Sequence, residues 1–359
     1  MKRTLAVLLC AVLCIGVCSC SEEEKEPART YELAMITVSE DKSIDDGDYV
    51  QSAWEGLKEY AEESGLTYKY YEPAKDSDSA RMKQIDRAAD SGALIVVCAG
   101  GAFQQVVAEA QEKYPDVTFI LSGAVPKDGS GEQKTASNCV GIEFNWSEAG
   151  FLAGYAAVQE GYRQLGFLGE SSEDEMKDYG YGFLQGCNAA AESLGVYVEV
   201  RYNYGSEDES AAKIQKKAEQ WYKEGTEVIF ACGDTVFDSV AVEADIADAL
   251  VIASDPQSRS ARSVLTTVVK DYGRGVGEQL AAFYSGEFPG GTILETGVAE
   301  EAVGLDMDSA QFTYFQPDDY REICDRLKEG EIKPASAQGA KTAVELTEKL
   351  QLRNVNLIV

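Results

Sequence analysis

The sequence contains no histidine among its 359 residues. This absence excludes Ser-His-Asp and Cys-His nucleophilic machinery, and it removes the commonest protein ligand of zinc and iron. The chain also lacks a GxGxxG or GxxxxGK[ST] motif, so nothing predicts a cradle for nucleotide phosphates. We therefore expect no catalytic residues, no metal site and no cofactor, and we predict that the protein is not an enzyme.

Basic residues are scarce relative to acidic ones. The chain has 62 acidic and 32 basic residues, which gives a formal net charge of −30. A surface of this sign repels the phosphate backbone of DNA and RNA. Nucleic acid is therefore not expected as a partner.

Cysteine pairs with metal-binding or redox spacing are also missing. Of the nine cysteines, four lie in the first twenty residues, and the other five are widely spaced without a CxxC motif. Two of these five sit within apolar runs, which is typical of buried thiols. We predict free, buried thiols at Cys98, Cys139, Cys187, Cys232 and Cys324.

The amino terminus predicts export and a membrane anchor. Lys2 and Arg3 precede an apolar run, Leu5–Val17, that is too short to span a bilayer comfortably, so residues 1–19 are interpreted as a signal peptide. The run ends in VCSC, which resembles a bacterial lipobox with Cys20 as the lipidated residue; an ordinary cleaved signal is the alternative. The acidic segment that follows favours a solvated tether over residues 20–30. The expected location is the extracytoplasmic face of the cell membrane.

The remainder of the chain has the pattern of a two-lobed α/β protein. From Tyr31 onward, short apolar runs alternate with amphipathic segments, as in βαβ units with a parallel sheet. About 340 residues at roughly 150 per domain suggest two domains. No low-complexity linker separates them, so we expect several crossings and a cleft at the carboxyl ends of both sheets. The predicted lobes are residues 31–142 with 272–303, and residues 143–271 with 304–359.

Several residues at predicted strand ends are candidates for binding a small ligand. Asp45, Asp46 and Asp48 precede a predicted helix, where acidic residues usually act as caps, but the position after a strand favours ligand contacts for Asp46 and Tyr49. Lys270 lies in an apolar β-branched run, where a cation is costly unless it is paired. Asp255 follows another apolar strand and could pair with Lys270, either around a ligand hydroxyl or as a plain structural salt bridge.

Motifs in a fixed order resemble the basic membrane protein family, the substrate-binding lipoproteins of ABC transporters that include the purine nucleoside receptor. The similarity covers nearly the whole mature chain. It implies the type I periplasmic binding protein fold, in which two doubly wound parallel-sheet lobes close on a small ligand. The motifs are LAMIT, SIDDGDYVQSAWEGL, VVCAGGAFQQVVAEAQEKYPDVTFIL, GIEFNWSEAGFLAGYAA, GFLGE, YGYGFLQG, YGSEDE, EVIFACGD, SDPQS and LTTVVK.

The resemblance also implies a set of ligand-binding positions. Tyr49 stands at the first of two aromatic residues that stack on the base, and Gln51 at the family's glutamine. Asp255 corresponds to the ribose-binding aspartate. Lys270 corresponds to the lysine of the LTSVVK segment, and Gly233 to the glycine after the VIF strand.

Several positions depart from the family pattern, among them Val38 and Ser39 in place of a TDxG aspartate, Val50 in place of an asparagine, and two of the ligand-binding candidates. Ser122 stands where the family has an aspartate, and Glu207 stands where it has the second stacking phenylalanine. Loss of one stacking ring costs about 1–3 kcal/mol in proteins that bind single-stranded bases. We keep both residues as ligand-binding candidates, together with Asp46.

Three functions follow as hypotheses. The first is a lipid-anchored solute-binding protein that captures a small polar molecule, a purine nucleoside being the leading candidate, and delivers it to an ABC permease. The second is an extracytoplasmic sensor of the same fold with a different small ligand. The third, a glycoside-cleaving enzyme with Asp46 and Glu207 as a carboxylate pair, is the least supported, because no other residue supplies a nucleophile or a metal site.

Overall fold

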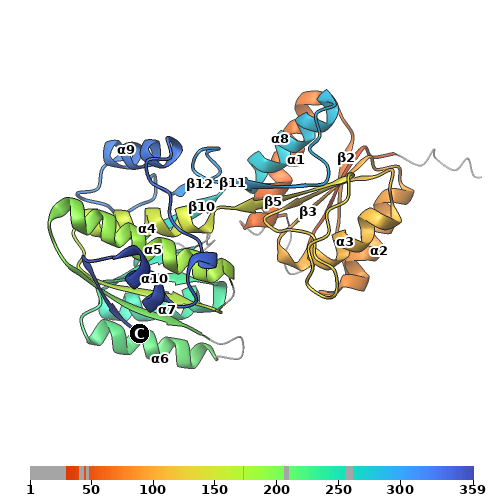
Figure 1. Ribbon diagram of the computed structural model, residues 1–359. Coiled ribbons are helices and arrows are strands. Elements are labelled where there is room, and N and C mark those ends of the chain that lie inside the picture. The colour runs from red at the N-terminus through yellow and green to blue at the C-terminus, as the bar shows by residue number, and fades with distance from the viewer. Residues whose placement is uncertain (1–29, 40–43, 46–47, 173, 206–209, 255–261) are drawn as a thin grey trace, which may run out of the picture.

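The computed structural model describes residues 30–39, 44–45, 48–172, 174–205, 210–254 and 262–359. Two separate β-sheets form two lobes that are joined by a narrow waist (Figure 1). The α/β prediction, with parallel sheets, is confirmed. The lobe boundaries predicted from the sequence stay a prediction.

The first lobe contains a six-stranded sheet in the order β11-β5-β4-β3-β1-β2. All neighbouring strands are parallel, and the central strands are fully buried, which explains their nearly continuous apolar sequences. The strands are β1 (Leu33–Ile36), β2 (Tyr68–Tyr71), β3 (Ile95–Ala99), β4 (Thr118–Ser122), β5 (Cys139–Phe144) and β11 (Thr292–Thr296).

The second lobe contains a seven-stranded sheet in the order β12-β10-β9-β8-β6-β7-β13. It is parallel except at one edge, where β12 runs antiparallel to β10. The strands are β6 (Gln164–Gly169), β7 (Val198–Tyr204), β8 (Val228–Cys232), β9 (Leu250–Ala253), β10 (Val264–Lys270), β12 (Val303–Leu305) and β13 (Val355–Ile358).

Helices cover both faces of each sheet. In the first lobe, α1 and α8 lie on one face and α2 and α3 on the other (Figure 1). In the second lobe, α4 and α5 pack on one face, and α6 and α7 pack over a separate apolar core on the other. The helices are α1 (Tyr49–Ser64), α2 (Asp78–Asp90), α3 (Gln104–Lys113), α4 (Trp146–Glu160), α5 (Asp174–Leu194), α6 (Ala211–Lys223), α7 (Asp234–Ala247), α8 (Tyr272–Ser285), α9 (Pro317–Lys328) and α10 (Ala343–Leu350), with short 3₁₀ turns at Gly101–Phe103 and Ala337–Gly339.

The chain crosses the waist three times, in agreement with the expectation of several crossings. The crossings are 144–146, between β5 and α4; 270–272, between β10 and α8; and 296–303, between β11 and β12. Each crossing lies at the carboxyl end of the strand that precedes it. The residues around these crossings therefore face both lobes.

The five cysteines beyond the amino-terminal segment are buried free thiols, as predicted. Burial raises the pKa of the Cys98 and Cys187 thiols well above the usual range. A thiol that stays protonated is a poor nucleophile, so these side chains act as small core residues. Within the described ranges, no helix is long and apolar enough to span a membrane.

Candidate functional site

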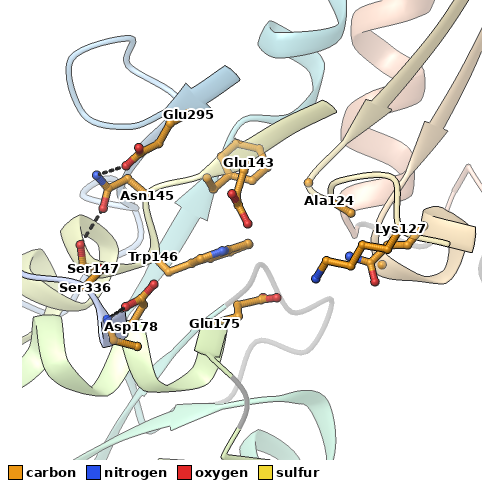
Figure 2. Close-up of a pocket in the computed structure, with 15 residues that line it drawn as sticks. Ala124, Lys127, Glu143, Asn145, Trp146, Ser147, Glu175, Asp178, Glu295 and Ser336 are labelled. Carbon is orange, nitrogen blue, oxygen red and sulfur yellow. Dashed lines mark hydrogen bonds between the residues drawn. The ribbon is translucent and has the colours of Figure 1, made fainter. Parts of the chain in front are cut away.

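A cavity of about 790 Å³ lies between the lobes, on the carboxyl side of both sheets. This volume is in the usual range for small-molecule sites. We call it the interlobe cleft, and Figure 2 shows the side chains around it. Its described wall consists of Gly101, Gln104, Gly123, Ala124, Lys127, Glu143, Phe144, Asn145, Trp146, Ser147, Glu175, Asp178, Glu295, Ser336 and Ala337.

Five consecutive residues at the first crossing, 143–147, lie in the cleft wall. Asn145 caps α4, because its side-chain oxygen accepts a hydrogen bond of 3.0 Å from the Glu148 backbone N–H. The same oxygen accepts a bond of 2.8 Å from the Ser147 hydroxyl, and the Asn145 amide donates to Glu295 Oε1 at 3.0 Å. The cap therefore ties the start of α4 in the second lobe to β11 in the first.

Four carboxylates of the described wall face the cleft, and they come from both lobes. Glu143 and Glu295 project from β5 and β11, where they are direct neighbours in the strand pairing. Glu175 and Asp178 come from the first turns of α5, and Asp178 accepts a hydrogen bond from the Ala337 backbone N–H. The interlobe cleft therefore has an acidic wall on each side (Figure 2).

The environment of Glu143 disfavours its charged form. Partial burial raises the pKa of the Glu143 carboxyl, the nearby Lys127 ammonium lowers it, and the Glu295 carboxylate raises it, with a raised pKa as the net result. Lys127 is the single cationic side chain of the described wall. Among the described residues, neither Glu143 nor Lys127 has an ion-pair partner, so their interaction acts at longer range.

A row of aromatic rings runs through the waist, and two of its members, Phe144 and Trp146, line the cleft. Tyr49 at the start of α1 and Tyr272 at the start of α8 have ring centroids 5.3 Å apart. Tyr272 lies 4.6 Å from Phe144, Phe144 lies 5.7 Å from Trp146, and Trp146 lies 5.3 Å from Tyr179. Such pairs add about 0.5–1.5 kcal/mol each beyond their burial, so this row links the two lobes.

Lys270 packs against the second-lobe end of this aromatic row. Its Nζ lies 4.5 Å from the centroid of the Trp146 ring and 5.5 Å from that of Tyr179, and the residue is 6% exposed. A buried ammonium group over aromatic faces gains about 2 kcal/mol when it is desolvated. This contact gives a physical reason for a cation within an apolar strand.

A family model described as ABC transporter substrate-binding protein, PnrA-like, matches residues 33–338. The chain belongs to this family. The family consists of solute-binding proteins and not of enzymes, in agreement with the prediction from the sequence. Membership implies a small-molecule ligand and a transporter partner.

The chain is similar in sequence to curated relatives and similar in fold to a solved structure. The chain is 25% identical over 337 residues to the ABC transporter nucleoside-binding protein BmpA of Lactococcus lactis subsp. cremoris, covering 86% of this chain and 92% of that protein. It is 23% identical over 307 residues to basic membrane protein A1 of Borrelia garinii subsp. bavariensis, covering 83% and 86%. An ABC transporter solute-binding protein from Aeropyrum pernix K1 has a similar fold, with a TM-score of 0.68, 19% identity and coverage of 90% and 98%.

The predicted ligand residues that the structure describes are absent from the described wall of the cleft: Tyr49, Gln51, Ser122, Gly233 and Lys270. The Tyr49 ring packs so closely on Gly100 that a β-carbon there would lie 2.7 Å from it, and the next residue, Gly101, lines the cleft. Ser122 is fully buried beside the cleft residue Gly123, and its hydroxyl has no hydrogen-bond partner among the described residues. Gln51 donates to Glu55 at 2.7 Å along α1.

Gly233 lies at the carboxyl end of β8 and has a φ of 104°, which favours glycine. A β-carbon at this position would collide with the Glu170 carboxylate, and the Gly233 N–H donates to the Ser254 hydroxyl at 3.4 Å. Asp48 proves to be the amino-terminal cap of α1, since its carboxylate accepts a bond of 2.8 Å from the Val50 N–H. Asp46, Glu207, Asp255 and Cys20 lie outside the described residues.

The acidic wall was not predicted from the sequence. The sequence holds one signal, because Glu143 is the only charged residue in the apolar strand β5 (CVGIEF) and lies one residue before its end. In the structure it is the single exposed residue of that strand. A charged side chain at that position faces the edge of the sheet where ligands bind. The contributions of Glu175, Asp178 and Glu295 carry no comparable signal, because they depend on how the lobes meet.

Proposed function

We propose that this chain is a lipid-anchored, extracytoplasmic substrate-binding protein that captures a small polar solute in the interlobe cleft and delivers it to the permease of an ABC transporter. The observation that carries the proposal is the 790 Å³ cavity at the carboxyl ends of both sheets in a member of this family. Cys20 is the proposed lipid attachment site, and residues 20–30 are the proposed tether.

Nucleosides are the leading ligand class, since one relative is named a nucleoside-binding protein. In support, the Tyr49 ring lies at the end of the aromatic row beside the cleft, and Lys270 lies behind Trp146. We propose ligand contacts for Asp46, Tyr49, Gln51, Ser122, Glu207, Gly233, Asp255 and Lys270.

Capture is proposed to occur by closure of the lobes. Residues 31–142 with 272–303 would move against residues 143–271 with 304–359, with the three crossings as the hinge. Hinge closure around a ligand is the usual conformational change of binding proteins of this kind. Small-angle scattering should record a smaller radius of gyration when a ligand is bound.

The test is a thermal-shift screen of the chain from Ser21 onward against nucleosides, nucleobases, sugars and amino acids, with calorimetry on each hit. A ligand at 100 times its dissociation constant stabilises the folded state by about 2.7 kcal/mol. One-to-one binding without product formation, together with loss of uptake in a deletion strain, supports the proposal. Binding without any loss of uptake would favour a sensor, and product formation would indicate an enzyme.

A further inference from the structure

We infer that the solute taken up by the interlobe cleft carries a positive charge on an amine or guanidinium group. This inference rests on the proposed function, because it concerns the ligand of the same cavity. The cavity places the ligand, and the charges of its wall decide which class of ligand is favoured. In the described part of the wall, four carboxylates and one ammonium group face the cavity, from Glu143, Glu175, Asp178, Glu295 and Lys127.

The first argument is the pairing of Glu143 with Glu295. The two residues are Cα partners on adjacent parallel strands, and both side chains are exposed to the cleft. Like charges on neighbouring strands destabilise a sheet. The Asn145 amide satisfies one oxygen of Glu295, but it is neutral and leaves both charges in place. A cationic group bound between them would remove the repulsion.

The second argument is the absence of a compensating cation on these two strands. Across the residues that the structure describes, no salt bridge involves Glu143 or Glu295. Lys127 interacts with Glu143 only at longer range and projects toward the same space from the segment between β4 and β5 (Figure 2). A carboxylate only accepts hydrogen bonds, so the favoured partner is a charged donor.

The third argument is that the acidic wall comes from both lobes. Glu143 projects from the first lobe and Glu175 from the second, and Figure 2 shows both side chains directed toward the space next to Trp146. Closure of the lobes would bring these carboxylates closer to a bound ligand and remove water, which strengthens charge interactions in the cleft. A cationic group on the ligand would then be attracted from both sides.

The test compares neutral ligands with cationic analogues of the same carbon frame. Calorimetry at low salt would use adenosine against 5′-amino-5′-deoxyadenosine, in which an ammonium replaces a hydroxyl, and 1,4-butanediol against putrescine, with agmatine and spermidine as further cations. Sugars and neutral amino acids complete the panel. We expect the cationic member of a pair to bind at least about tenfold more tightly, as a charge-assisted hydrogen bond provides. Added salt should reduce this preference.

Variants then test whether the acidic wall is the cause. Glu143→Gln and Glu295→Gln should each weaken cation binding about tenfold, and the binding of neutral ligands less. Lys127→Gln should act in the opposite direction and tighten cation binding several-fold, which a loss of folding cannot mimic. Glu59→Gln, an equal change of charge on the exposed face of α1, is the matched control and should have no effect.

Each outcome decides the inference. The inference is supported if the preference for cations is lost in Glu143→Gln and enhanced in Lys127→Gln. Binding of adenosine, a sugar or another neutral solute with equal or higher affinity than every cation overturns the inference, while solute capture stands. Failure of every compound in the panel to bind at millimolar concentration overturns both.

Discussion

In each lobe two helices pack closely through glycines, but the second lobe has more such glycines than the first. In the first lobe, Gly56 of α1 meets Gly273 of α8 backbone to backbone, and farther along the pair the Tyr60 and Tyr284 rings stack at 6.1 Å. In the second lobe, α4 and α5 meet through glycines over two successive turns of each helix. The four glycines there are Gly150, Gly154, Gly182 and Gly186.

This difference bears on how firmly each side of the cleft is held. Both pairs carry residues of the site at their amino-terminal ends: Tyr49 and Tyr272 in the first lobe, and Trp146 and Asp178 in the second. A glycine contact has no side chain that could move aside, whereas a pair of partly exposed rings can adjust. The second-lobe wall should therefore tolerate substitution less than the first-lobe wall.

The largest effect is expected for Gly182→Ala in α5. A β-carbon at this position would overlap the Ser147 carbonyl group and the Phe151 backbone N of α4, and neither can rotate away. We expect a loss of at least about 3 kcal/mol of folding free energy, above the usual range for overpacking because the obstacle is backbone. Denaturant unfolding measures the loss, and hydrogen exchange should locate it in α4 and α5. A change below about 1 kcal/mol would contradict the rigid contact.

A smaller effect is expected in the first lobe, where a matched pair of glycines is available. Gly56→Ala should cost about 1–3 kcal/mol, because its β-carbon would overlap the Gly273 backbone. Gly277→Ala is the control: its β-carbon would lie 4.0 Å from the nearest atom, the Gly56 carbonyl oxygen. Alanine there should stabilise α8 by roughly 0.5–1 kcal/mol through helix propensity. Equal melting temperatures for the two variants would show that α1 and α8 move apart to accommodate the added methyl group at little cost.

The sequence predicts the layers and the position of the site better than its chemistry. Apolar runs such as those of β3 and β8 indicate buried parallel strands, because neither face of such a strand meets water. Gly233 and Ser122, which the family resemblance indicated, lie at the carboxyl ends of β8 and β4, and this is the edge of the sheet where α/β folds bind ligands. These features depend on local periodicity and on a general rule of the fold.

The acidic wall depends instead on contacts between distant parts of the chain. Asn145 bonds to Glu295 over a separation of 150 residues, and β11 reaches β5 only after the chain has built most of the second lobe. Nothing near Glu295 in the sequence marks it as a neighbour of Glu143. The family resemblance directs attention to other positions, so it did not reveal these carboxylates either.

The smallest effect is expected for Glu143→Gln, and it should depend on pH. The pKa of the Glu143 carboxyl is raised in the folded state, chiefly by burial and also by Glu295, while Lys127 opposes the rise. The charged form therefore destabilises the fold at neutral pH, and this cost disappears as the pH falls through the raised pKa toward the unfolded value near 4.3. Glu143→Gln should stabilise the ligand-free protein at pH 7 by at most about 1 kcal/mol, because solvent screens the group.

The stabilising effect of Glu143→Gln should shrink below pH 4, where the wild-type carboxyl is protonated as well. Melting temperatures of the two proteins between pH 3.5 and 7.5 measure this convergence, and hydrogen exchange should place the change at β5 and β11 and not in α4 or α5. A constant difference across the whole range would mean that the substitution acts through packing. If Glu143→Gln raises stability and lowers ligand affinity, the Glu143 carboxylate serves ligand binding at a cost to the stability of the fold.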